Sequence, residues 1–153
     1  MKKDCVFCNL KGKEVIVYKD NKCIGLISKA PLNKHHVIII PRNHYISSQQ
    51  VPNTLFAHMF ILAKKIATAI TKACKADGIT IIHDDGIFKT REHFTLHIIP
   101  RFKNDKIGGH YKRAKDPGLK LRSEYAKDIK KYVKNHPSEM GGMIPSASLS
   151  GGF

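Results

Sequence analysis

The segment from Glu92 to Arg101 constrains the fold more than any other part of the chain, because polar and apolar side chains alternate in it from His93 to Ile98. Side chains two positions apart share one face of a β-strand, so we expect a strand over 93–99. One face would carry Phe94, Leu96 and Ile98, and the other would carry His93, Thr95 and His97. Imidazole nitrogens next to an apolar face lose hydration unless they meet a metal, a phosphate or another polar partner. The pattern therefore predicts a binding site on this strand.

The remaining periodicities predict an α+β domain with one long helix. Apolar residues recur at helical spacing from Leu55 to Ala73, with Asn53 or Thr54 as the N-cap and Gly78 as the stop signal. Apolar and amphipathic runs predict further strands over 14–18, 23–28, 36–40 and 79–82, and a short C-terminal helix over 122–133. Strands grouped around a single long helix indicate a mostly antiparallel sheet of about five strands.

The length of 153 residues suits a single domain with its own core. We assign residues 1–136 to this domain and expect the Gly- and Ser-rich residues 137–153 to form a disordered tail. No apolar run approaches the roughly 18 residues of a membrane span, and the basic start is not followed by the apolar stretch of a secretory signal. Four cysteines without such a signal indicate a cytoplasmic, reducing environment, with metal binding favoured over disulfides and no membrane partner.

A formal charge of +15 favours polyanionic partners such as nucleotides or nucleic acids. The excess is concentrated between Arg101 and Lys134, where there are twelve basic residues and four acidic ones. Aromatic rings are interleaved with them, namely Phe102, His110, Tyr111 and Tyr125. Such a stretch can bind single-stranded nucleic acid through phosphate contacts and stacking. The alternative is a solvated, lysine-rich surface with no role in recognition.

Cys5 and Cys8 form a C-x-x-C pair near the start of the sequence. Two thiolates supply half of a tetrahedral zinc shell, so two further histidine or cysteine ligands must come from elsewhere in the chain. The candidates are His44 and His93. The alternative is that the two thiols are small, buried apolar groups.

Three motifs together resemble the histidine-triad (HIT) family. They are the C-x-x-C start, the β-branched run and Pro-Arg-Asn-His turn between His36 and His44, and the H-x-T-x-H strand. The resemblance extends from Cys5 to Arg101 and implies the HIT-like fold and, as is common in the family, a homodimer. It is strongest to the zinc-containing bacterial branch. By that likeness the ligands of a structural Zn²⁺ are Cys5, Cys8, His44 and His93, and four protein ligands leave no open position for a catalytic water.

The resemblance also implies a nucleotide phosphate site. In the family, histidines of the triad strand and one of an earlier strand surround the α-phosphate, which places His36 and His97 beside Thr95 in this chain. The family's chemistry is covalent catalysis, in which the middle imidazole of the triad attacks phosphorus. Thr95 takes that position, and a hydroxyl is a weak nucleophile unless a neighbouring base activates it. We therefore expect weak or absent hydrolysis, with some binding retained.

Further nucleotide contacts are expected from the loops beside these strands. Ser28 aligns with an aspartate that holds the ribose hydroxyls in the zinc-containing branch, and a short polar side chain can retain one such contact. Thr90 takes the place of a serine before the triad. Lys89 and Arg91 add positive charge that suits a polyphosphate or, alternatively, belongs to a solvated loop. Asp84 takes the position of an asparagine that often contacts the sugar or the phosphate.

Three hypotheses for the function follow. The first is a protein that binds purine nucleotides, with weak or absent hydrolysis because of Thr95. The second is an active hydrolase of nucleoside phosphoramidates, dinucleoside polyphosphates or adenylated nucleic-acid ends, with His36 or His97 as the base. The third is a protein that engages DNA or RNA ends through the basic C-terminal region.

Overall fold

The computed structural model describes residues 2, 4–107 and 114–133. The expected tail, 137–153, lies outside the described residues, as do His110 and Tyr111 of the basic stretch. In chain order the elements are β1 (Ile16–Lys19), β2 (Cys23–Ile27), β3 (Val37–Pro41), the 3₁₀ turn η1 (Ser48–Gln50), α1 (Asn53–Cys74), β4 (Gly78–Ile82), the 3₁₀ turn η2 (Gly86–Phe88), β5 (Leu96–Arg101) and α2 (Leu119–Val133).

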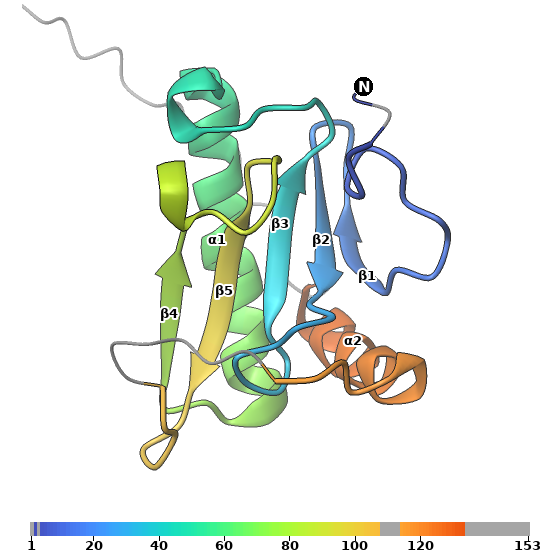
Figure 1. Ribbon diagram of the computed structural model, residues 1–153. Coiled ribbons are helices and arrows are strands. Elements are labelled where there is room, and N and C mark those ends of the chain that lie inside the picture. Colours follow the sequence, from blue (N-terminus) through green and yellow to red (C-terminus); the bar gives the residue numbers. More distant parts are fainter. Residues whose placement is uncertain (1, 3, 108–113, 134–153) are drawn as a thin grey trace, which may run out of the picture.

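The strands form one antiparallel sheet in the order β1-β2-β3-β5-β4 (Figure 1). This confirms the predicted α+β class, with a five-stranded sheet, one long helix and one short C-terminal helix. The order makes β3 and β5 neighbours, although α1 and β4 separate them in the sequence. The register pairs Ile38 with His97. The two histidine-bearing segments of the sequence therefore lie side by side at the centre of the sheet.

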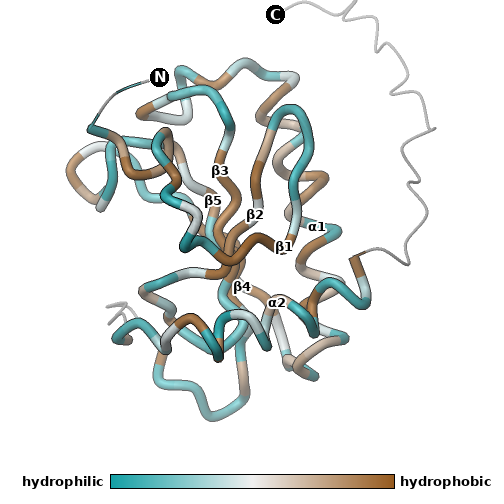
Figure 2. Tube along the Cα trace, turned by 90° about the vertical axis from the view of Figure 1, so that its right-hand side faces the viewer, coloured by the Kyte–Doolittle hydropathy of each residue, from teal (hydrophilic) through white to brown (hydrophobic). Residues whose placement is uncertain are grey.

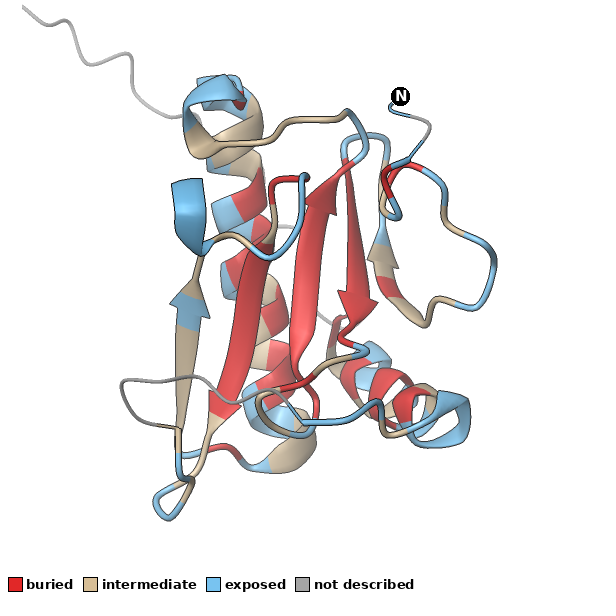
Figure 3. Cartoon of the chain, in the orientation of Figure 1, coloured by how far each residue is buried: buried red, intermediate tan, exposed pale blue. Residues whose placement is uncertain are grey.

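The central strands are buried on both faces, which explains the continuous apolar run of β3. Val37 and Ile39 belong to the main core, together with the buried residues of α1 and α2. A smaller cluster consists of Ile24, Leu26, Ile38 and Ile40, with Phe7, Leu10 and Ile16 packed against it. Strands β2, β3 and most of β5 are buried, whereas the edge strands β1 and β4 are partly exposed (Figure 3). The central strands are also among the most hydrophobic segments of the chain (Figure 2).

The helix α1 buries one apolar stripe, as its spacing predicted. The buried residues are Met59, Leu62, Ala63, Ile66, Ala69 and Ile70. The predicted caps, Asn53 or Thr54, were wrong, because the N-cap is Pro52 and no side chain makes a cap hydrogen bond. The predicted stop was wrong as well: the helix ends where Lys75 takes left-handed backbone angles (φ 53°, ψ 44°), and Gly78 is the first residue of β4.

By its length and composition alone, α1 is long and apolar enough to cross a membrane. The expectation that no segment of the chain reaches this length was therefore wrong. A core helix passes the same test, and one such helix is weak evidence for a membrane. The buried stripe of α1 belongs to the main core of the domain.

Asp20 ties the β1–β2 hairpin to α1. Its Oδ1 accepts hydrogen bonds from the backbone N–H groups of Lys22 and Cys23 at 2.7 and 2.6 Å. Its Oδ2 accepts from the Tyr18 hydroxyl at 2.9 Å and from Nε2 of His58 at 2.7 Å. Asp20, Cys23 and His58 also satisfy the spacing of metal donors, but burial raises the pKa of the Cys23 thiol to about 12. We interpret this cluster as a structural tie, because the Asp20 carboxylate already accepts four hydrogen bonds.

The strand β5 begins at Leu96 rather than at His93, so the predicted start of this strand was wrong. The predicted apolar face is nevertheless confirmed, since Phe94, Leu96 and Ile98 all belong to the main core. The difference arises because His93 contacts the N-terminal segment, where its Nδ1 lies 3.4 Å from Sγ of Cys5. The position of His93, before the start of β5, is thus set by side-chain partners outside the sheet and not by hydrogen bonds to a neighbouring strand.

Candidate functional site

Four donor side chains meet between the N-terminal segment and the sheet. Cys5, Cys8, His44 and His93 each offer one ligand atom, and these atoms all lie within 4.8 Å of one another. Sγ of Cys8 is 3.3 Å from Nδ1 of His44, and Sγ of Cys5 is 3.4 Å from Nδ1 of His93. A backbone hydrogen bond from the Cys8 N–H to the Cys5 carbonyl at 3.1 Å closes the turn that brings the two thiols together. The structure therefore assembles all four of the predicted metal-binding side chains.

The imidazole of His93 is oriented for binding a metal ion. Its Nε2 lies 3.0 Å from the carbonyl oxygen of Pro41, which can only accept, so Nε2 carries the proton. The lone pair of Nδ1 is then directed at the two thiols. Burial lowers the pKa of His93 and so favours the neutral ring that a metal ion requires. A carbonyl that fixes the tautomer of a ligand histidine is a typical outer partner in metal sites.

The donor set fits zinc. Two sulfur and two imidazole ligands are a common tetrahedral set for Zn²⁺. Nε2 of His44 is buried and has no hydrogen-bond partner among the described residues, whereas Nδ1 of the same ring faces the cluster. Four protein donors would fill the coordination shell, so an ion held here would be structural.

A second group of side chains joins His36 to Thr95 in a directed series of hydrogen bonds. The backbone N–H of Leu32 donates to Nδ1 of His36 at 3.1 Å, so the proton of the neutral His36 ring is on Nε2. That Nε2 lies 3.0 Å from Nδ1 of His97 and donates to it. The proton of the neutral His97 ring is therefore on its own Nε2, which lies 3.4 Å from Oγ1 of Thr95.

The direction of this series decides what His97 can do. A neutral His97 whose Nε2 is protonated offers a hydrogen-bond donor to the space around Thr95. It can bind an anionic oxygen, but it has no lone pair with which to take the proton from the Thr95 hydroxyl. His36 is fully buried behind it, so it acts on this space only through His97. The arrangement therefore suits anion binding better than activation of a hydroxyl.

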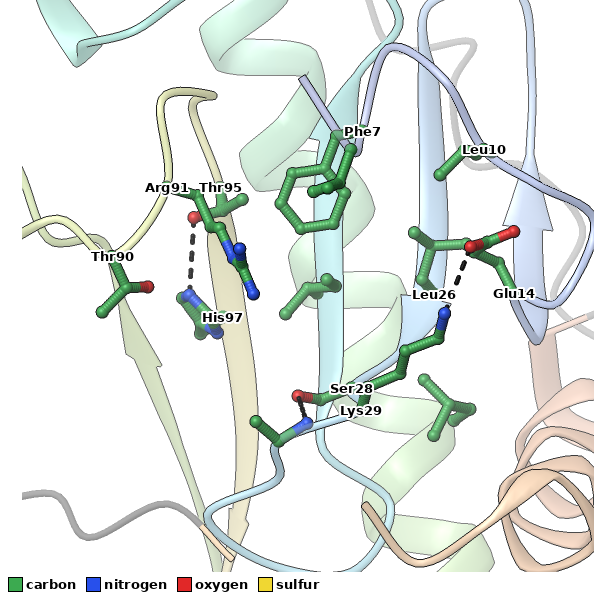
Figure 4. A pocket seen from close by; sticks show the side chains of 14 residues that line it. Phe7, Leu10, Glu14, Leu26, Ser28, Lys29, Thr90, Arg91, Thr95 and His97 are labelled. Carbon is green, nitrogen blue, oxygen red and sulfur yellow. Dashed lines mark hydrogen bonds and ion pairs between the residues drawn. The ribbon is translucent and has the colours of Figure 1, made fainter. Parts of the chain in front are cut away.

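A cleft with a volume of about 360 Å³ opens beside His97 (Figure 4). Its polar lining includes Ser28, Thr90, Arg91, Thr95 and His97. Its apolar lining includes Val6, Phe7, Leu10, Leu26, Ile27 and Ile38. Thr90, Thr95 and His97 lie across the cleft from Leu10 and Leu26, and Ser28 lies beside Lys29 on the side of Leu26 (Figure 4). A ligand with an apolar ring and an anionic group matches this division.

Glu14 and Lys29 add an ion pair to the cleft wall. Nζ of Lys29 lies 3.2 Å from Oε1 of Glu14. Burial by itself raises the pKa of Glu14, but the Lys29 ammonium and nearby backbone N–H groups outweigh it and hold this pKa below its usual value. The pair therefore contributes no net charge to the cleft.

Four of the seven predicted nucleotide-binding residues line the cleft, and three do not. Ser28, Thr90, Thr95 and His97 line it, although Ser28 is only 3% exposed and its Oγ accepts from the Ala30 N–H at 3.2 Å. His36, Asp84 and Lys89 are not among the lining residues, and His36 reaches the cleft only through its contact with His97. A nucleotide contact of Asp84 stays a prediction, whereas the pairing of Lys89 with Glu92 at 3.3 Å favours the alternative of a solvated loop.

Sequence reasoning missed the apolar side of the cleft. Phe7 lies inside the C-x-x-C pair and Leu10 follows it, so these side chains are carried over the sheet by the same segment that supplies the thiols. Two apolar residues beside a predicted metal-binding pair were the available signal for this feature. His83, a further candidate from the sequence, donates from Nδ1 to the Thr95 carbonyl at 3.0 Å, and its ring centroid lies 4.3 Å from that of Phe94.

Comparison with known proteins places this geometry in a family. A model of the HIT domain matches residues 9–104, which begin just after Cys8. An adenylylsulfatase of Arabidopsis thaliana is 29% identical over 141 residues, which cover 89% of this chain and 71% of that protein. A bis(5'-adenosyl)-triphosphatase of Dictyostelium discoideum is 26% identical over 109 residues, or 67% of this chain and 73% of that protein. The crystal structure of a zinc-bound histidine triad family protein from Mycobacterium smegmatis has a TM-score of 0.75 at 27% identity, covering 86% of this chain and 94% of that one.

Proposed function

The chain belongs to the HIT domain family, and from that premise we propose that it binds purine nucleotides in the cleft beside His97, with weak or absent hydrolysis. The observation that carries the proposal is the direction of the hydrogen bonds from Leu32 to Thr95. It makes His97 a donor to a phosphate oxygen and leaves the Thr95 hydroxyl without a base. A cleft of this kind holds a phosphate but lacks an activated nucleophile.

The division of the cleft supports a nucleotide as the ligand. The base would stack in the apolar part near Phe7, and the α-phosphate would accept hydrogen bonds from Nε2 of His97 and from the Thr90 hydroxyl. The names of two relatives, an adenylylsulfatase and a bis(5'-adenosyl)-triphosphatase, describe compounds that contain adenosine. In this proposal Thr95 takes the place of the imidazole that attacks phosphorus in active members of the family.

We also propose that the chain belongs to the zinc-containing branch and holds one structural Zn²⁺ through Cys5, Cys8, His44 and His93. The spacing of the four donor atoms and the tautomer of His93 support this assignment. The zinc-bound structural neighbour supports it as well. The ion would fasten the N-terminal segment, and with it Phe7, over the cleft.

The test of impaired hydrolysis is a comparison of the protein with its Thr95→His variant. Substrates are adenosine 5'-phosphoramidate and diadenosine triphosphate, and AMP binding is measured in parallel by calorimetry. We expect both proteins to bind AMP and the variant to turn over at least about a hundredfold faster, because removal of a nucleophile usually costs several orders of magnitude. Equal turnover by the two proteins would favour the alternative, an active hydrolase that uses Thr95 or water.

The basic C-terminal stretch supports nucleic-acid binding only in part. Arg122 and Tyr125 are buried, and Arg122 pairs with Asp116 at 3.1 Å, so neither is available to a nucleic acid. The exposed basic residues of α2 are Lys120, Lys127, Lys130 and Lys131. If these lysines contact phosphates, the affinity of the protein for a short single-stranded nucleic acid must fall steeply as the salt concentration rises. A flat salt dependence would show that they are solvated surface.

We further propose a homodimer formed through the β4 edge of the sheet. This edge carries an exposed Ile81, and η2, which follows it, exposes Ile87 and Phe88. An edge strand with unpaired backbone groups and exposed apolar side chains is suited to pairing with a second copy.

A further inference from the structure

We propose that Arg91 makes the cleft selective for nucleoside diphosphates and triphosphates, because its guanidinium binds the phosphate that follows the α-phosphate. The inference rests on the proposed nucleotide binding and adds a specificity to it. Arg91 lies on the loop before β5 and lines the cleft together with Thr95 and His97. Its side chain extends from this loop into the space between Thr95 and Phe7 (Figure 4).

The charges of the cleft leave Arg91 without a counter-ion. Glu14 is the one carboxylate among the lining residues, and it is neutralised by Lys29 at 3.2 Å. Within the described part of the chain, Arg91 has neither a hydrogen bond nor an ion pair. A guanidinium at the wall of a cleft, with no carboxylate to oppose it, favours an anionic ligand.

The other basic residue of this loop, Lys89, has its charge paired and lies outside the cleft lining. Its Nζ lies 3.3 Å from Glu92, so this positive charge is paired locally, and Lys89 does not line the cleft. The positive charge that the loop contributes to the cleft is therefore that of Arg91. The two side chains are two positions apart and carry the same charge, which makes Lys89 a matched control.

The position of Arg91 relative to His97 indicates which phosphate it binds. His97 is buried at 7% exposure and presents one N–H donor, which suits the α-phosphate of a ligand whose base lies in the apolar part. Arg91 is exposed whereas His97 is buried, so the guanidinium lies nearer the solvent than Nε2 of His97 and meets groups that continue from the α-phosphate toward the mouth of the cleft. A guanidinium can donate two parallel hydrogen bonds to one phosphate group. A nucleoside monophosphate has no group at this place.

The test compares AMP with ADP for the parent protein, Arg91→Gln, Arg91→Lys and Lys89→Gln. Affinities are measured by calorimetry at low salt, without magnesium and without chelators that would remove a bound metal. We expect the parent to bind ADP at least about tenfold more tightly than AMP, as one charge-assisted contact provides. In Arg91→Gln the ratio should fall to about one or two while AMP affinity changes by less than about threefold. Arg91→Lys should restore part of the ratio, and Lys89→Gln should keep all of it.

The possible outcomes separate this inference from the proposed function. If AMP and ADP bind equally to the parent, or if Arg91→Gln keeps the preference for ADP, the role of Arg91 is refuted and nucleotide binding stands. If neither nucleotide binds to any of the four proteins, both proposals fail together. Unfolding curves of the variants serve as the folding control. We expect them to differ little, because Arg91 is exposed and the partly exposed Lys89 takes part only in an ion pair with the exposed Glu92.

Discussion

Nε2 of His36 donates to Nδ1 of His97 across 3.0 Å, so one buried imidazole fixes the position of the proton on another. The backbone N–H of Leu32 sets the direction of this bond, because it can only donate and occupies Nδ1 of His36 at 3.1 Å. A main-chain group in the loop before β3 thereby determines which hydrogen-bonding atom β5 presents to the cleft. This relationship links the fold to the chemistry of the proposed site.

The tautomers of the two rings can be observed directly. We expect ¹⁵N–¹H correlation spectra at neutral pH to show both His36 and His97 protonated at Nε2 and not at Nδ1. In His36→Gln the acceptor for Leu32 moves, and the signals of His97 should change towards a mixture of tautomers. A spectrum of the parent protein in which Nδ1 of His97 carries the proton would contradict the series of hydrogen bonds and remove the main support for impaired hydrolysis.

Loss of a cysteine from the proposed zinc site should release the metal and destabilise the domain. We expect Cys8→Ser to reduce the zinc content from about one ion per chain to near zero, because three remaining ligands bind a structural ion poorly. Thermal unfolding should shift to a lower temperature by several degrees or more, as the N-terminal segment loses its attachment. Elemental analysis and calorimetry measure the two effects.

Cys74 provides the control for this experiment. It is a thiol on α1 that belongs to neither donor cluster, and its Sγ donates to the Ile70 carbonyl at 3.2 Å within the same helix. Cys74→Ser should retain both the zinc and nearly all of the thermal stability. Equal loss of zinc in both variants would show that the metal is not held by the assigned ligands.

Much of the fold was accessible from the sequence because its signals are local. The β-branched run of β3 and the helical spacing of α1 report burial directly, and they predicted both elements within a few residues. The caps of α1 were not accessible in this way. Lys75 takes the left-handed conformation that ends α1, whereas Gly78, the residue type best suited to this conformation, comes three residues later and begins β4. The residue type therefore did not reveal where α1 ends.

The site residues were predictable where a sequence motif fixes their spacing along the chain. They were not predictable where packing between segments far apart in the sequence determines their positions. The convergence of His36 and His97 follows from the antiparallel pairing of β3 with β5. The apolar side of the cleft, formed in part by Phe7 and Leu10, does not follow from any hydrophobic periodicity in the sequence. Both residues come from a segment without a helix or a strand. Their position depends on the turn closed by Cys5 and Cys8.

Asp105 should make the stability of the domain sensitive to acid. The Arg101 guanidinium, at 2.8 Å, and the backbone N–H of Phe102 hold the pKa of the Asp105 carboxyl well below its usual value. Because the folded pKa is depressed, this stabilisation is complete above the unfolded value of about 4 and is lost as the pH falls further. Asp105 also accepts a hydrogen bond from Asn33 at 3.2 Å, which connects the segment after β5 to the loop that contains Leu32.

The measurement is the free energy of unfolding in denaturant between pH 3 and pH 7. We expect Asp105→Asn to be clearly less stable than the parent at pH 7 and the difference to shrink as the pH falls below about 4. Asp84→Asn is the matched control, since Asp84 makes no hydrogen bond or ion pair within the described part of the chain. A difference between parent and Asp105→Asn that stays constant over this range would refute the linkage to the ionised carboxylate.

The proposed homodimer predicts the mass of the protein in solution and predicts that substitutions on the β4 edge of the sheet change this mass. The chain has a mass of 17.2 kDa, and light scattering behind a sizing column should give twice that value for the parent protein. Ile81→Lys should shift the mass to that of a single chain, because a buried lysine at the centre of an interface on β4 would lose its hydration without gaining a partner. Leu119→Lys, at an exposed apolar residue of α2 (56% exposed), should leave the mass unchanged. If the parent elutes as a single chain, or if only Leu119→Lys lowers the mass, then β4 does not form the interface.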